Sequence, residues 1–250
     1  MRAINWALVY ANFKMVVRNK QALYFSLVFP LITMLVLKLV LGKTTLANGL
    51  NYIDFVIPGL VTMSLMQMSV FAIAFVVAQQ KEKGVIKRLL ATPMRAFDYL
   101  AAQVFARVVI SVIQVLLLVA ISILILSFTL KGSFFTLIVL AALGALVFLS
   151  LGFIVSGMSK SVETVPAIAN LIIFPMIIFG NIFFPLDKSP NWVKTFSEFL
   201  PVRYLVDSFR DTMIKGSSLY DVRYDILGLL VWLIVLAFVA QRVFSLGTKN

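Results

Sequence analysis

Six long apolar runs constrain this chain more than any other feature of its sequence. A helix needs about 20 mainly apolar residues to cross the roughly 30 Å hydrocarbon core of a membrane. The runs cover approximately residues 23–42, 55–78, 108–130, 134–157, 165–184 and 226–244. Hydrophobic residues make up 62% of the chain and charged residues only 13%, far from the usage of soluble domains. The sequence therefore predicts an all-α membrane protein with six transmembrane helices.

The chain contains no cysteine and no histidine. Their absence excludes disulfides, thiolate nucleophiles, Cys/His metal sites and the side chain that most often acts as a general base near pH 7. The remaining polar residues form no recognisable pairing of nucleophile and base, so we predict no catalytic residue, metal site or cofactor in this chain. A membrane enzyme is the weakest interpretation.

Residues 41–45, LGKTT, resemble the end of a phosphate-binding loop. The match fails because Leu37 stands where that motif needs its first glycine, and because the segment ends an apolar run instead of following a strand. ATP binding by this chain alone is therefore not expected. Energy from ATP would have to come from a separate chain.

The formal net charge of +12 is distributed unevenly along the chain. The basic clusters are Arg2, Lys14, Arg18 and Lys20 before the first run, and Lys81, Lys83, Lys87, Arg88 and Arg95 after the second. The two short loops expected on the opposite side carry only Lys43 and Lys131. Short cytoplasmic loops hold the excess of Lys and Arg and meet anionic lipid. We therefore expect both termini to be cytoplasmic and the charge to contact membrane lipid, with no nucleic acid as partner.

Residues 1–22 are expected to form an amphipathic helix at the cytoplasmic surface of the membrane. Trp6 and Phe13 fall on its apolar face at helical spacing, while Lys14 and Arg18 lie elsewhere on the helix. The apolar face would sit at the lipid boundary, and the basic side chains would reach headgroups or a partner. Whether the helix only anchors the first span or also contacts a partner stays open.

The loop before the last run, residues 185–215, is expected to carry two short helices on the outer surface. Trp192 and Phe196 recur at helical spacing, and Pro201 marks the boundary between the two helices. Two further pairs, Arg203 with Asp207 and Asp211 with Lys215, have the i, i+4 spacing of helical ion pairs. We expect these helices to act as an outer lid.

Residues 79–94, QQKEKGVIKRLLATPM, place a dense group of charges between two apolar runs. From Gly84 onward the apolar residues gather on one side of a helix, while Lys87 and Arg88 lie on the other. Pro93 ends the helix because proline disfavours the helical conformation of the residue before it. The pattern predicts a short cytoplasmic helix at about 82–93. From the residues alone, its charges serve either to set the topology or to dock on a partner.

Polar and easily deformed side chains within the runs are candidates for a substrate path. Met63 and Met66 are flexible thioethers that accept varied apolar ligands, and Gln67 and Asn170 are polar residues in the second and fifth runs. Ordinary lipid-facing packing explains the methionines equally well. None of the acidic residues is expected deep within a span, which argues against a transporter coupled to protons or sodium.

Three separated segments of the chain resemble type-2 ABC exporter permeases, a family that includes bacterial drug and antibiotic exporters. They are RNKQALYFSLVFPL at 18–31, EKGVIKRLLATP at 82–93 and FFPLDKSPNWVKTFSEFLPVRYLVDSFRD at 183–211. The resemblance covers nearly the whole chain in order. It implies a multi-pass protein of the bacterial plasma (inner) membrane. It also implies two partners: a second permease, either another copy of this chain or a similar protein, and two cytoplasmic ATP-binding subunits that use ATP and Mg.

The resemblance also implies a role for residues 82–93 as a coupling helix that rests in a cleft of the ATP-binding subunit. Residues Glu82, Gly84, Leu89 and Pro93 match the E, G, L and P of the family's motif. Lys87 and Arg88 are our addition, because they face away from the apolar side and could pair with acids on that subunit. In the family, the amphipathic helix before the first span contributes to the same contact.

The expected function is export of a hydrophobic drug-like molecule or a lipid, by alternating access driven by the separate ATPase. Export of a lipid-linked glycan is an alternative, but the 22 phenylalanines are scattered and form no Tyr/Trp track for sugars. A protein from a different class, a membrane assembly protein without transport activity, would need no ATPase. An ABC ATPase encoded in a neighbouring reading frame would favour the exporter.

Overall fold

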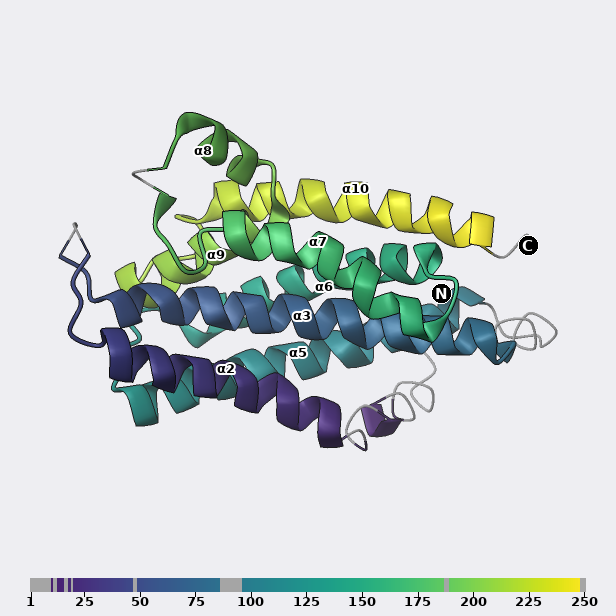
Figure 1. Cartoon of the computed structure of the whole chain (residues 1–250), viewed down its shortest axis with the longest axis horizontal. Helices are drawn as coiled ribbons and strands as arrows, with labels where there is room; N and C mark the ends of the chain where they lie inside the picture. The colour runs from purple at the N-terminus through teal and green to yellow at the C-terminus, as the bar shows by residue number, and fades with distance from the viewer. Residues whose placement is uncertain are drawn as a thin grey trace.

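The computed structural model describes residues 10, 13–15, 18, 20–46, 49–85, 96–186 and 189–247. Long helices dominate the described residues and lie side by side as one bundle (Figure 1). The bundle contains α2 (Lys20–Leu41), α3 (Tyr52–Glu82), α5 (Ala96–Leu126), α6 (Phe134–Met158), α7 (Val165–Phe179) and α10 (Arg223–Gly247). The shorter elements are η1 (Val162–Thr164), α8 (Asn191–Glu198), α9 (Pro201–Arg210) and the π-helical turn η3 (Asp211–Lys215).

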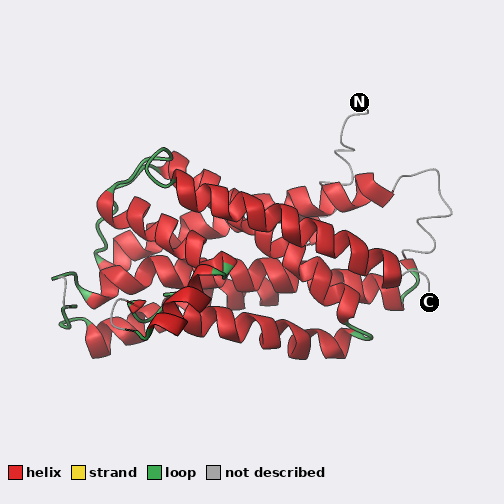
Figure 2. Ribbon diagram, turned by 90° about the horizontal axis from the view of Figure 1, so that it is seen from above, coloured by secondary structure: helices red, strands yellow, loops and turns green. Residues whose placement is uncertain are grey.

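Six of the helices correspond to the six expected spans. Five helical segments in the described part of the chain are long and apolar enough to cross a membrane, and α2 adds the shorter apolar stretch Ser26–Leu41. The connecting loops lie mostly at the two ends of the bundle (Figure 2). The prediction of an all-α membrane protein is therefore confirmed.

The third expected span differs most at its start from the helix that the structure contains. The third expected span, 108–130, corresponds to α5, which begins at Ala96 and ends at Leu126. Its earlier start brings Arg107 inside the bundle, where the guanidinium donates to the carbonyls of Ala72 and Gln103 and only 2% of the residue is exposed. The helix stops at Leu126 because Ser127 adopts a left-handed conformation with φ of 56°.

Helices α3 and α6 form the centre of the core. Their close approach depends on Gly152, where a Cβ atom would lie 2.6 Å from the carbonyl oxygen of Val70. Small residues let helix backbones approach in this way when apolar lipid offers little drive for association. Phe148 of α6 and Leu65 of α3 are fully buried in this core. Helix α3 is thus held in the middle of the bundle, and each of its two ends contributes residues to a polar site described below.

The two ends of the bundle are named after residues that they contain. The Arg210 end holds α8, α9 and the beginning of α3 (Figure 1). The Glu82 end holds the end of α3 and the η1 turn that opens α7. The last residues of α10 also lie at the Glu82 end, in yellow in Figure 1.

Candidate functional site

The fifth expected span, 165–184, is interrupted before it is complete. Helix α7 ends at Phe179, and Asn181 adopts a left-handed conformation with φ of 59°. Carbonyl and N–H groups of non-helical backbone must be satisfied by other protein groups where no water reaches them. The Asn181 carbonyl receives a 2.7 Å hydrogen bond from the guanidinium of Arg210 in α9. The interruption of α7 is thus held by a side chain from the following helix.

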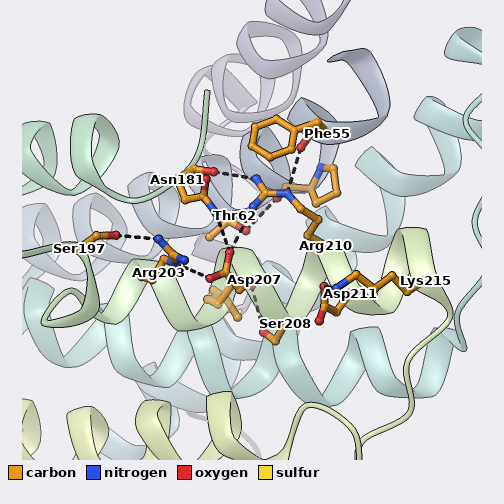
Figure 3. A network of polar contacts seen from close by, with 12 residues as sticks. Phe55, Thr62, Asn181, Ser197, Arg203, Asp207, Ser208, Arg210, Asp211 and Lys215 are labelled. Atoms are coloured by element: carbon orange, nitrogen blue, oxygen red, sulfur yellow. Dashed lines mark hydrogen bonds and ion pairs between the residues drawn. The ribbon is translucent and has the colours of Figure 1, made fainter. Parts of the chain in front are cut away.

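Arg210 is the centre of a polar network that joins three elements of the bundle (Figure 3). Its guanidinium lies 3.8 Å from the centroid of the Phe55 ring of α3 and also donates to the Phe55 carbonyl. It forms a 3.2 Å ion pair with Asp207, one turn earlier in α9. Only 8% of Arg210 is exposed. A buried charge that is both paired and hydrogen-bonded is costly to disrupt, so this network fastens α9 to α3.

Asp207 completes the network by receiving hydrogen bonds from several directions. Asn181 donates its side-chain N–H to Asp207 at 2.9 Å, and the guanidinium of Arg203 binds the second carboxylate oxygen. The i, i+4 pair of Arg203 with Asp207 is therefore present, as the sequence predicts. The other expected pair, Asp211 with Lys215, is also present at 2.7 Å, but it lies at the surface.

The residues of the expected lid are divided between an exposed helix and a buried one. Trp192 and Phe196 lie on α8, and both rings contact Phe179 edge-on at the end of α7. Trp192 is 65% exposed. Pro201 begins α9 and is buried. A lid at this end would therefore consist of α8, because α9 is fastened to α3.

The Glu82 end contains the first residues of the expected coupling segment. Glu82 is the last residue of α3, so it belongs to the long helix and does not begin a separate short one. Its carboxylate accepts a 2.7 Å hydrogen bond from the backbone N–H of Val162. The preceding Lys81 donates to the carbonyl of Ser156 at 3.0 Å. Gly84 has φ of +63°, a left-handed conformation that suits glycine and ends the helix.

The structure describes only part of the two helices expected to contact the ATP-binding subunit, residues 1–22 and 82–93. Lys87, Arg88, Leu89 and Pro93 lie outside the described residues, so the helix at 82–93 stays a prediction beyond Val85. Trp6 also lies outside them. Residues 13–15 are helical, Lys14 and Arg18 are exposed, and Phe13 is half-buried.

The four residues of the candidate substrate path do not share one environment. Met66 is fully buried in the core of the bundle and cannot line a path in this conformation. Met63 and Gln67 are half-buried, one turn apart on α3. Asn170 is exposed on α7. A path would therefore use Met63 and Gln67 on α3 and Asn170 on α7. Figure 1 shows α3 between α2 and α7.

Several structurally important polar residues were missed at the level of sequence. The expected third span leaves Arg107 outside it, and the sequence patterns assign no role to Arg210 or Asn181. The D-x-x-R spacing of Asp207 and Arg210, and a polar residue directly after the apolar part of α7, are signals that could have found them. Gln114 of α5 donates to the Ser64 hydroxyl of α3 at 2.6 Å and ties the two helices together.

Comparison with known proteins gives the family. A model of the ABC-2 type transporter family matches residues 5–214. ABC transporter G family member 20 of Dictyostelium discoideum is 29% identical over 205 residues, which are 80% of this chain and 28% of that protein. The probable multidrug ABC transporter permease YbhS of Escherichia coli (strain K12) is 24% identical over 164 residues, 65% of this chain and 44% of that protein.

A third relative is similar in length to this chain. The putative transport permease YvfS of Bacillus subtilis (strain 168) is 24% identical over 209 residues, 83% of this chain and 84% of that protein. The chain thus spans less than half of the first two relatives and most of the third. Because the family model matches residues 5–214 of a chain that folds as a bundle of apolar helices, the chain belongs to the ABC-2 type transporter family.

Proposed function

We propose that this chain is the transmembrane permease subunit of an ATP-driven ABC exporter. The observation that carries the proposal is the family match over residues 5–214, which includes every long helix of the bundle except α10, and the segment that follows α3. The names of the relatives YbhS and YvfS, both permeases, support it. The cargo is a hydrophobic drug-like molecule or a lipid. Lipid-linked glycan is the alternative cargo, and a membrane assembly protein without transport activity is the alternative function.

The complex contains a second copy of the chain and two ABC ATP-binding subunits, which use ATP and Mg. We assign the contact with the second copy to α2 and α7, whose exposed large apolar side chains include Phe29, Ile32, Leu171, Phe174 and Ile178, and we assign the equally apolar exposed face of α10 to lipid. Because the chain lacks cysteine, a single introduced cysteine reports on this contact. Phe174→Cys on α7 should form a disulfide-linked dimer, whereas Ile234→Cys on the exposed face of α10 should not.

The Glu82 end faces the cytoplasm of a bacterial cell, and the chain crosses the plasma (inner) membrane with both termini inside. The basic residues near this end support the orientation through the positive-inside rule. Cysteines at exposed positions test it in intact cells. A membrane-impermeant maleimide should label Lys215→Cys at the Arg210 end and should not label Lys83→Cys at the Glu82 end. Labelling in the opposite pattern would reverse the orientation.

Transport follows from movement of the coupling segment, residues 82–93. ATP draws the two ATPase subunits together, and each carries the segment docked on it. The segment joins α3 to α5, so its displacement moves both helices and changes which side of the membrane Met63, Gln67 and Asn170 face. ATP can shift this equilibrium only if the ATPase contacts the two conformations with different affinity. Helix α8 serves as the outer lid.

The decisive experiment is purification of the chain with its ATPase, followed by reconstitution in lipid vesicles. ATPase activity is measured against panels of drugs, lipids and lipid-linked glycans. Stimulation by drugs or lipids supports the proposed cargo, and stimulation by glycans supports the alternative. If no ATPase copurifies, the assembly protein is favoured.

A pair of basic residues tests the docking contact. The double variant Lys87→Ala with Arg88→Ala should lose the copurifying ATPase, because it removes two of the three positive charges in the coupling segment. The matched control is Lys43→Ala with Lys131→Ala, which removes two exposed charges at the Arg210 end. Retention of the ATPase by the first variant would contradict the contact.

A further inference from the structure

Adjacent residues at the end of α3 hold both sides of the connection between α6 and α7. Lys81 donates to the carbonyl of Ser156, which lies in the last turn of α6. Glu82 accepts the N–H of Val162, the first residue of η1, which runs directly into α7. The two residues of the Glu82 bond are 80 positions apart in the chain. The bond therefore exists only because the tertiary structure brings α3 beside the start of α7.

The N–H of Val162 is a suitable partner for a carboxylate. It belongs to the first turn of a helical run, where N–H groups lack acceptors within the helix, and negative charge is favoured at a helix N-terminus. The neighbouring polar groups are already engaged with one another. The hydroxyl of Thr164 accepts from the N–H of Ser161 and donates to the Ser161 carbonyl. The Val162 N–H is left for Glu82.

The position of Glu82 in the chain gives this bond a mechanical consequence. Lys83 closes α3 by donating its N–H to the carbonyl of Gln79, and Gly84, whose N–H donates to the Lys81 carbonyl, turns the chain away. Glu82 is thus the last residue of a rigid helix and the first of the coupling segment. Any displacement of that segment moves the Glu82 carboxylate with it.

We propose that Glu82 is a strut that transmits movement of the coupling segment to α7. This role rests on the proposed function and deepens it, because the coupling segment is continuous only with α3 and α5. Through Glu82, the start of α7 follows α3, and Lys81 keeps the end of α6 in the same register. Glu82 is thus a positioning residue that acts within the chain, and it does not need to contact the ATPase.

The bond itself is tested on the permease alone in lipid nanodiscs, by hydrogen exchange at the Val162 amide. Glu82→Ala removes the acceptor and should speed exchange about tenfold, as expected for loss of a charge-assisted hydrogen bond. Glu82→Gln keeps an acceptor oxygen without the charge and should show a smaller increase. Glu163→Ala is the matched control, because it removes an exposed acid one residue away and should change nothing. Unchanged exchange in Glu82→Ala would overturn the strut.

Its mechanical role is tested in the complex with the copurified ATPase. Spin labels are attached to Gln79→Cys and Lys160→Cys, two exposed positions on either side of the bond, in a chain without native cysteine. With Glu82 present, the distance between the labels should be the same without nucleotide and after trapping with ATP and vanadate. In a Glu82→Ala background, the two states should differ by several ångströms. Substrate export should fall at least tenfold while ATPase activity persists.

Two results would overturn the role: a distance that changes between the states with Glu82 present, or full export by Glu82→Ala. If no ATPase copurifies with the wild-type chain, the proposed function fails and the mechanical role fails with it. Hydrogen exchange at Val162 still reports separately on the bond, so the two failures are distinguishable.

Discussion

The two ends of α3 are fastened to the rest of the bundle in different ways. At the Arg210 end, one buried guanidinium stacks on Phe55 and binds both Asn181 and Asp207. At the Glu82 end, Lys81 donates to the carbonyl of Ser156 and Glu82 accepts the N–H of Val162, so these contacts reach the backbone of neighbouring segments. The first arrangement is a buried, branched network, and the second consists of separate contacts near the surface.

This difference indicates which end of α3 can move. Buried polar networks lose several interactions together when one member leaves, and the groups left behind cannot turn to water. Hydrogen bonds at exposed positions contribute little to the free energy of unfolding, because water replaces them when the chain opens. We infer that the Arg210 end acts as the pivot of α3 and that the Glu82 end is where a partner can displace it. The following predictions test this contrast, from the largest expected effect to the smallest.

Replacing Arg210 should cause the largest loss of stability. Arg210→Ala removes the ion pair to Asp207 and leaves the Asn181 carbonyl without its donor, so we expect a loss of about 3 kcal/mol in the free energy of unfolding. Denaturant titration in detergent micelles measures the loss. Arg223→Ala is the control, because its guanidinium lies over the exposed rings of Tyr220 and Tyr224. Equal losses of unfolding free energy in the two variants would contradict the claim that burial makes Arg210 more important for stability than Arg223.

A methyl group at Gly59 of α3 should destabilise the packing of the Arg210 end against the backbone that follows α7. A Cβ atom there would lie 2.5 Å from the carbonyl oxygen of Ile182, in the backbone that follows α7. Backbone yields less easily than a side chain, so Gly59→Ala should cost about 2 kcal/mol. At Gly144, a Cβ atom would also approach to 2.5 Å, but against the end of the Leu205 side chain. Thermal unfolding should therefore show a smaller loss for Gly144→Ala, and the reverse order would contradict this argument.

Removing the Glu82 side chain should barely change stability. Because the residue is exposed, Glu82→Ala should cost less than about 1 kcal/mol in the free energy of unfolding. The denaturation midpoint of this variant, measured beside that of Arg210→Ala, gives the contrast directly. A loss as large as that of Arg210→Ala would show that the Glu82 end is fastened as firmly as the Arg210 end.

The smallest effect is expected at Asp221, which lies at the Arg210 end but is exposed. Its carboxylate accepts hydrogen bonds from the N–H and the hydroxyl of Ser218, and these bonds lower the pKa of Asp221 below its usual value of 3.8. A lowered pKa stabilises the folded state above pH 3.8, and this contribution is lost as the pH falls through the lower, folded-state pKa. The small advantage of the wild type over Asp221→Asn should therefore be present at pH 5 and vanish in strong acid. An advantage that grows as the pH falls would contradict the assignment.

The sequence predicts local features of this protein more reliably than the pairing of distant ones. The pair Arg203 with Asp207 follows from i, i+4 spacing on one helix, and the structure contains it. Arg107 lies inside the bundle because the carbonyl of Ala72, 35 residues away, accepts its proton. A hydropathy scale scores Arg107 as strongly polar whatever its partners are, and so the expected span begins after it. A buried charge depends on partners that periodicity cannot reveal.

The candidate coupling site shows the same division. The charge block and Pro93 predict a short helix after the second span, and Glu82 is matched to it by motif. The structure assigns Glu82 to α3 and pairs it with Val162. No local pattern distinguishes an acid that faces a partner protein from one that closes a contact within the chain. Met66 is a similar case, since the same residue type suits a ligand surface and a packed core.

The sequence by itself determined the six apolar helices and the family, because the length and composition of apolar runs, together with short ordered motifs, are properties of the chain. The tertiary structure alone decided which polar groups meet: Arg210 with Asn181 at one end of α3, and Glu82 with Val162 at the other. The physical reason is that a buried or capped polar group is stabilised by whichever donor or acceptor lies within hydrogen-bonding distance. That distance is set by packing between helices that are far apart in sequence.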